Sequence, residues 1–280
     1  MPLGGRVRTY RLVRPPAAED RPAPLVVVLH GGFGSGAQAQ QAYGWDALAA
    51  REGFAVAYPD GIGRSWNAGT CCGPARRYGI DDVAFIEGVV ADVAGLVGLD
   101  PARIYATGIS NGGMLAYRLA CELPGRFAAL GPVAATMVCE CPRPAPVSIL
   151  HIHGLEDRNI PFAGGVGAKA RDARPRPSVP SVMEYWRRGA GCGPPSVSGT
   201  PPVRVESAFS PTGVEVTVIS LEGVGHVWPG SRPPSPGVAA MLDLDPPSQA
   251  IDATAALWSF FARHPAPGIG TGVGHDGDRD

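Results

Sequence analysis

Continuous apolar runs alternate along the chain with segments of helical character. Two segments whose apolar and polar residues alternate, 5–13 and 214–223, are typical of an edge strand and of the last strand. The longer apolar runs predict strands buried on both faces of a sheet: LVVVLH (25–30), FAVAYPDG (54–61), RIYAT (103–107), FAALGPVAATM (127–137) and VSILHIHG (147–154). Helices are predicted over 41–52, 81–97, 114–121, 179–188 and 248–264. Because strands and helices alternate, we predict an α/β fold with a mostly parallel central sheet and helices on both faces.

A chain of 280 residues is long enough for one large α/β domain or two small ones, and because nothing in the sequence forces a split we predict one domain. Residues 1–264 are expected to form it, and the tail 265–280 is expected to be disordered. Residues 62–79 and 163–211 are rich in glycine, proline or arginine and are predicted to be long loops, the second around one helix. Asp81 and Asp82 stand at a predicted helix start, so a structural role is favoured over a catalytic one.

Charge and composition exclude several classes of function. The formal net charge of −1 argues against binding to nucleic acid or acidic membranes, and no apolar stretch is long enough to span a bilayer. Six cysteines lack the spacing of a zinc site and favour one or two disulfides, so we expect a secreted protein, although the first ten residues contain no apolar signal segment. We also expect a monomer.

The sequence GISNG at 108–112 follows a predicted strand and precedes a predicted helix. In that context the pattern Gly-x-Ser-x-Gly indicates a nucleophile elbow, in which glycines allow the sharp turn that exposes the Ser110 hydroxyl. The alternative is a glycine-rich turn in which Ser110 only caps the helix.

An activated serine needs a base, and the base needs an oriented acid, all at the carboxyl ends of strands. His226 stands in a loop directly after the last strand and is our candidate base. His30 is predicted to brace a loop, and His151 and His153 are predicted to be core histidines. Glu156 and Asp157 both leave a strand at this edge, and Asp157 is preferred as the acid because HGLEDRNIP (153–161) resembles a turn in which the second of two acidic residues carries the triad acid. The order Ser110, Asp157, His226 is characteristic of α/β hydrolases.

A glycine-rich loop, HGGFGSG at 30–36, follows the first central strand. It lacks the lysine and the spacing of a nucleotide-binding loop. We therefore predict that the backbone amide of Gly32 or Phe33, together with that of Asn111, forms an oxyanion hole.

Taken together, these segments resemble one family: LHGG (29–32), WNAGTCCGP (66–74), GIDDVAFI (79–86), GISNGGMLAYRLAC (108–121), HIHGLEDRNIP (151–161) and GVGHVWPG (223–230). They are similar to the extracellular polyhydroxybutyrate depolymerase and feruloyl esterase group, over residues 5–264. The resemblance implies an α/β hydrolase fold and a serine esterase without metal or organic cofactor. It also implies that Trp228 lines the acyl pocket with Trp66 close by. A cysteine that could pair with Cys192 in relatives is missing from AFSPTG (208–213).

The expected substrates are polyhydroxybutyrate-type polyesters or oligomers, or feruloyl and other hydroxycinnamoyl esters of plant polysaccharide. An acetyl or general small-ester carboxylesterase is the alternative, because fold and triad do not set acyl preference. A peptidase of this fold is disfavoured, since no lid or propeller domain is recognisable. A catalytically silent binding module is the alternative from another class.

Overall fold

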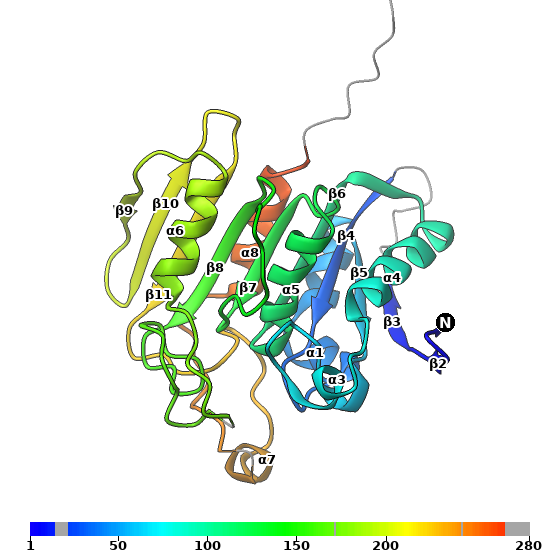
Figure 1. The fold of residues 1–280 in the computed structure, drawn as a ribbon, viewed down its shortest axis with the longest axis horizontal. Coiled ribbons are helices and arrows are strands. Elements are labelled where there is room, and N and C mark those ends of the chain that lie inside the picture. The colour runs from blue at the N-terminus through cyan, green and yellow to red at the C-terminus, as the bar shows by residue number, and fades with distance from the viewer. Residues whose placement is uncertain (15–21, 171, 242, 267–280) are drawn as a thin grey trace, which may run out of the picture.

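The structure, a computed structural model, describes residues 1–14, 22–170, 172–241 and 243–266. Its centre is a nine-stranded sheet in the order β3-β5-β4-β6-β7-β8-β11-β10-β9 (Figure 1). The strands are β3 (Tyr10–Val13), β4 (Ala23–Leu29), β5 (Ala55–Pro59), β6 (Leu99–Ile109), β7 (Ala129–Val133), β8 (Ser148–Gly154), β9 (Ser196–Ser198), β10 (Val203–Phe209) and β11 (Glu215–Leu221). The neighbours from β5 to β11 pair in parallel, whereas β3, β10 and β9 pair antiparallel at the two edges. The predicted mostly parallel sheet is therefore confirmed.

Helices cover both faces of this sheet. They are α1 (Gly36–Ala42), α2 (Trp45–Glu52), α3 (Gly73–Arg77), α4 (Asp82–Leu96), α5 (Asn111–Glu122), α6 (Val179–Gly189), α7 (Pro236–Met241) and α8 (Ala253–Arg263), with a 3-10 turn η1 (Ile62–Arg64). Val27 of β4 packs in one core cluster with residues of α4, α5 and α6, whereas Val28 packs in a second with residues of α2 and α8. Figure 1 shows α4, α5 and α6 on one side of the strands and α8 on the other. Because successive residues of a strand face opposite ways, the apolar run of β4 fills both cores.

Several predicted boundaries were wrong near glycines and in the N-terminal segment. The helix predicted over 41–52 is two helices, because Gly44 between them is in the left-handed region with φ 79°. The loop predicted over 62–79 contains η1 and α3. The strand predicted over 5–13 is divided, since β2 (Arg6–Val7) pairs with β1 (Pro2–Leu3) and only β3 joins the main sheet.

The segment 163–211 contains more structure than predicted. Strand β10 pairs antiparallel with β11 along seven residues and carries β9 on its outer edge. Most of β10 is not buried, so it lacks the apolar signal by which the central strands were found.

Two other predicted elements are shorter than expected. The strand predicted over 127–137 is reduced to β7, and the last helix begins at Ala253 rather than at 248. Residues 267–280 of the predicted disordered tail lie outside the described residues.

Candidate active site

Ser110 occupies a strained turn between β6 and α5. Its φ of 55° and ψ of −121° are rare for a residue with a side chain. A Cβ atom on Gly112 would lie 2.2 Å from the carbonyl oxygen of Leu29, and one on Gly108 would lie 2.6 Å from the same oxygen. Only glycine fits at these two positions. The Ser110 side chain makes no capping hydrogen bond to α5 within the described chain, so the helix-cap interpretation does not account for it.

Asp157 and His226 meet at the carboxyl ends of β8 and β11. Asp157 Oδ2 lies 2.6 Å from His226 Nδ1, while its Oδ1 accepts hydrogen bonds from the backbone amides of Asn159 and Ile160, both at 2.8 Å. The Asp157 side chain is fully buried, whereas the His226 side chain is 16% exposed. The neighbouring Glu156 is exposed. The buried carboxylate can therefore hold the Nδ1–H tautomer of His226 and leave Nε2 to accept a proton.

Ser110 and His226 line one cavity of about 1180 Å³ at this edge of the sheet, and Asp157 lies buried behind His226. The cavity lining includes the predicted residues Gly32, Phe33, Ser110, Asn111 and His226. The structure thus places the candidate nucleophile, the candidate base and the oxyanion loop around a shared space that can hold a small organic substrate.

Of the two predicted oxyanion donors on the loop 30–36, only Gly32 is retained as a candidate. The Phe33 amide already donates to the carbonyl oxygen of Arg64 at 2.8 Å. Gly32 therefore replaces Phe33 as the candidate donor of this loop. The second candidate, the Asn111 amide, lies at the start of α5, where backbone N–H groups lack partners within the helix.

A buried hydrogen-bond network fixes the two donor segments against each other. The Asn111 side chain accepts from the Trp66 amide at 2.6 Å and donates to the Trp66 carbonyl at 3.0 Å. The Trp66 indole donates to the His30 carbonyl at 2.8 Å. His30 Nδ1 lies 2.7 Å from the Gly31 carbonyl oxygen, while Nε2 accepts from the Gly61 amide at 3.0 Å. Burial lowers the pKa of His30, so the ring is neutral and braces the loop, as its place in the sequence predicted.

Trp66 and Trp228, which were predicted to contact the substrate, are buried away from the cavity. The two side chains are 0% and 2% exposed, and neither is among the described residues that line the cavity. The Trp228 indole donates to the Thr254 hydroxyl at 3.0 Å, and its ring stacks on Tyr43 at 4.5 Å. Since both indole N–H groups have buried partners, the rings belong to the core, and Trp66 serves the site through its backbone.

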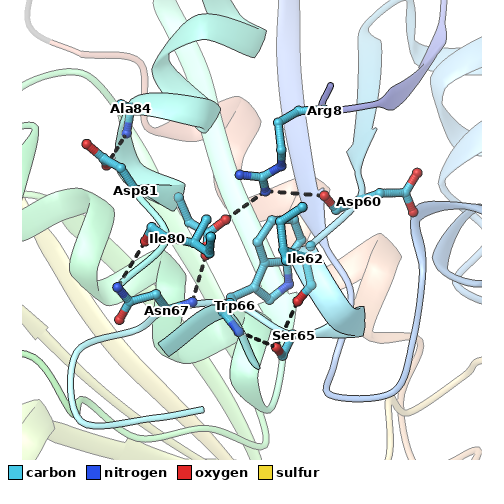
Figure 2. Close-up of polar contacts among 12 residues, drawn as sticks. Arg8, Asp60, Ile62, Ser65, Trp66, Asn67, Ile80, Asp81 and Ala84 are labelled. Carbon is cyan, nitrogen blue, oxygen red and sulfur yellow. Dashed lines mark hydrogen bonds and ion pairs between the residues drawn. The ribbon is translucent and has the colours of Figure 1, made fainter. Parts of the chain in front are cut away.

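A second polar network supports the wall of the cavity formed by residues 62–80 (Figure 2). Arg8 donates to Asp82 Oδ1 at 2.7 Å, and Asp82 Oδ2 accepts from the Asn67 amide at 2.7 Å. The Asn67 side chain donates to the Ile80 carbonyl at 2.9 Å. Asp81 Oδ1 accepts from the Ala84 amide at 2.9 Å and caps α4. The two aspartates therefore have the structural roles that were predicted.

Cationic side chains distinguish this wall. Arg64, Arg76 and Arg77 line the cavity, and no described carboxylate forms an ion pair with them. Two further cations of the lining are neutralised: Lys169 lies 3.0 Å from Asp245 Oδ1, and Arg176 lies 2.8 Å from Asp172 Oδ1. The cavity therefore carries an excess of positive charge on the side formed by 62–80.

Asp245 is a site residue that the sequence analysis missed. Its Oδ2 accepts from the His226 amide at 2.7 Å. Although burial favours the neutral acid, this hydrogen bond and Lys169 hold the pKa of Asp245 below its ordinary value. Asp245 follows a proline-rich loop without periodicity, so no pattern in the sequence pointed to it.

The sulfurs of Cys121, on α5, and Cys141 are bonded, which agrees with the predicted one or two disulfides. Cys71 and Cys72 are adjacent on the cavity wall. Cys139 and Cys192 have free thiols, which agrees with the absence from 208–213 of a cysteine that could pair with Cys192. Among the described residues, no group of three or more His, Cys, Asp or Glu side chains is arranged to hold a metal ion. Each helix in the described ranges is too short or too polar to cross a bilayer.

Comparison with known proteins gives consistent matches. Residues 8–188 match the family described as Esterase PHB depolymerase. The protein named "Putative esterase NocK" from Nocardia uniformis subsp. tsuyamanensis is 33% identical over 263 residues, which cover 86% of this chain and 76% of that protein. Feruloyl esterase B from Piromyces equi is 29% identical over 220 residues, 74% of this chain but only 40% of the fungal protein. Among solved structures, the acetyl xylan esterase from Aspergillus awamori is 16% identical and has a TM-score of 0.59, covering 83% of this chain and 92% of that one, which supports the α/β hydrolase fold.

Proposed function

The chain belongs to the PHB depolymerase family of esterases, and from this premise we propose that Ser110, His226 and Asp157 are its catalytic triad. The observation that carries the assignment is the 2.6 Å contact between Asp157 Oδ2 and Nδ1 of His226, a residue that lines the same cavity as Ser110. Acyl transfer requires an imidazole oriented by a carboxylate and a serine on a strained strand-to-helix turn, and here both the imidazole and the serine line one cavity.

The proposed chemistry has two steps. His226 Nε2 takes the proton of the Ser110 hydroxyl as its oxygen attacks the ester carbonyl carbon, and Asp157 stabilises the imidazolium. The amides of Gly32 and Asn111 donate to the oxyanion, each lowering the barrier by about 3 kcal/mol. His226 then returns the proton to the leaving alcohol. A water molecule, deprotonated by His226, attacks the acyl-enzyme and releases the acid, which restores Ser110.

Oligomers of 3-hydroxybutyrate are the proposed substrate class. Each such oligomer ends in a free carboxylate, and Arg64, Arg76 and Arg77 supply the unpaired positive charge that would attract it. Feruloyl and related hydroxycinnamoyl esters are the second candidate, favoured by the similarity to the Piromyces equi feruloyl esterase. A general small-ester carboxylesterase would prefer neither hydroxybutyrate oligomers nor hydroxycinnamoyl esters over short simple esters.

The test is hydrolysis of matched esters by the purified protein. The panel contains hydroxybutyrate trimer as the free acid and as its methyl ester, methyl ferulate and methyl p-coumarate, and short p-nitrophenyl esters. We expect the free-acid trimer to give the highest kcat/KM, and the double variant Arg76→Glu/Arg77→Glu to lose the preference for the acid over its methyl ester. A preference for methyl ferulate that survives this variant would favour the hydroxycinnamoyl esterase instead.

The triad is tested by Ser110→Ala. We expect this variant to lose several orders of magnitude of turnover on every ester and all labelling by a fluorophosphonate probe. Near-normal turnover would remove Ser110 from the mechanism. A wild-type protein that neither turns over esters nor reacts with the probe would be a silent binding module.

We also propose a secreted monomer. The disulfide between Cys121 and Cys141 supports an oxidising compartment. Size-exclusion chromatography coupled to light scattering tests the monomer, and thiol counting without reductant tests the disulfide, since six free thiols would contradict it.

A further inference from the structure

Behind Asp157 lies a buried row of three side chains that we call the relay: Tyr117 of α5 and His151 and His153 of β8. All three are at most 1% exposed. His151 and His153 are two residues apart on one strand, so they share a face, and their rings stack with centroids 5.2 Å apart. The Tyr117 hydroxyl lies 2.7 Å from His151 Nδ1, and His151 Nε2 lies 3.0 Å from His153 Nδ1. These distances make the relay a continuous hydrogen-bonded chain.

The contact between His153 and Ile160, at the end of the relay, fixes which atom donates in each of the other hydrogen bonds. His153 Nε2 lies 2.8 Å from the carbonyl oxygen of Ile160, which can only accept, so this nitrogen carries the proton. Burial lowers the pKa of His153 to about 4, so the ring is neutral at pH 7 and its Nδ1 accepts from His151. Burial also lowers the pKa of His151 well below its ordinary value, so His151 Nδ1 accepts in turn from the Tyr117 hydroxyl. One set of tautomers satisfies all three contacts.

The proton end of the relay reaches the proposed triad. His153 Nε2 lies 3.4 Å from Asp157 Oδ2, the oxygen that also contacts His226 Nδ1. Ile160 is held on both sides, because its amide donates to Asp157 Oδ1 and its carbonyl accepts from His153. The titratable groups that contact the two histidines or act on them are therefore Tyr117 from α5, Asp157 from the loop after β8, and His226 from the loop after β11.

We propose that His153 is a positioning residue of this esterase: its Nε2–H holds the turn from Asp157 to Ile160 and contacts the carboxylate oxygen shared with His226, while Tyr117 and His151 fix the tautomer that makes this possible. The inference rests on the proposed triad. A neutral ring at His153 supplies a donor without a competing charge, so the Asp157 carboxylate remains available to the imidazolium that forms on His226.

The first test compares the kinetics of three variants with those of the wild type. His153→Phe keeps a ring but removes the donor. It is expected to lower kcat about 10- to 100-fold with little change in KM, because the Ile160 carbonyl becomes a buried acceptor without a donor and the turn that carries Asp157 loses its anchor. It is also expected to move the acidic limb of the pH profile of kcat/KM to higher pH, because the partial positive charge of the Nε2–H, 3.4 Å from Oδ2, no longer weakens that oxygen as an acceptor for His226 Nδ1–H. Tyr117→Phe removes only the relay's first donor and should give a smaller loss in the same direction.

His264→Gln is the matched control. His264 also contacts a backbone carbonyl and a carboxylate, those of Phe260 and Glu215, but at the end of α8. It should leave kcat and the pH profile unchanged. Normal kcat and an unmoved acidic limb in His153→Phe would overturn the proposal.

The second test uses the wild-type protein and so does not depend on a variant that folds. Nitrogen-15 spectra of labelled histidine should show His151 and His153 as neutral rings protonated on Nε2 from about pH 5 to about pH 8. A ring protonated on Nδ1 would overturn the proposal. Failure of the triad is recognised separately: Ser110→Ala would then retain activity, whereas an inactive Ser110→Ala beside a normal His153→Phe would refute the relay alone.

Discussion

The buried ion pair between Arg8 and Asp82 offers a quantitative test of how the cavity wall is held. The two side chains are 2% and 0% exposed, and their charged atoms are 2.7 Å apart. In Arg8→Met the Asp82 carboxylate keeps the Asn67 amide as a donor but loses its cationic partner. Removing one member of such a pair costs about 3–5 kcal/mol, because a buried charge is left uncompensated. The guanidinium also lies over the Phe85 ring, 3.7 Å from its centroid, so its loss removes packing as well.

Urea unfolding followed by circular dichroism measures this cost. At roughly 2–4 °C per kcal/mol for a chain of this size, Arg8→Met should also lower Tm by about 6–20 °C. The double variant Arg8→Met/Asp82→Asn removes the orphaned charge and keeps an acceptor for Asn67. It should therefore be more stable than Arg8→Met alone.

The matched control is Arg103→Met. Arg103 forms a pair with Asp100 at 2.6 Å, but the two side chains are 40% and 26% exposed, so its loss should cost at most about 1 kcal/mol. The reasoning fails if Arg8→Met costs no more than Arg103→Met, or if the double variant is less stable than Arg8→Met. Because Asp82 also holds Asn67 at the cavity, Arg8→Met should lower kcat/KM, whereas Arg103→Met should not.

Two further predictions concern pH and the elbow. Burial lowers the pKa of His153 from 6.5 to about 4, so the unfolded chain binds a proton in that range that the folded protein does not. The free energy of unfolding should therefore fall by about 3 kcal/mol as the pH drops from about 6.5 to about 4, and His151 acts in the same direction. His153→Phe should flatten the plot of unfolding free energy against pH. Equal slopes in the variant and the wild type would contradict this. Gly112→Ala would place its Cβ 2.2 Å from the Leu29 carbonyl oxygen, so it should abolish ester hydrolysis and lower Tm. The control is Gly95→Ala on α4, where the added Cβ has no neighbour within 4 Å and neither activity nor Tm should fall. A fully active Gly112→Ala enzyme would refute the close approach.

Periodicity and local chemistry were enough to predict the central strands of the sheet, the turn at Ser110 and the candidates for the other two triad residues. Strands such as β4 and β8 are continuous apolar runs because both faces are buried, so their signal is strong in the sequence. The glycines around Ser110 identify a turn that no other residue can make, and His226 and Asp157 each follow a strand end at the ligand-binding edge. These features depend on neighbouring residues and on chain order, which are visible without coordinates.

Only the tertiary structure decided which groups face the cavity. Trp66 and Trp228 looked like pocket residues, but their indole N–H groups bond to His30 and Thr254, residues distant in the chain. The Phe33 amide is taken by a carbonyl 31 residues away, at Arg64. The contact of His153 with Asp157 depends on the path of a turn, because periodicity gives the face of a strand but not what the next loop brings against it. Contacts between segments far apart in sequence carry no local pattern, so burial and hydrogen bonding settle them only after the chain has folded.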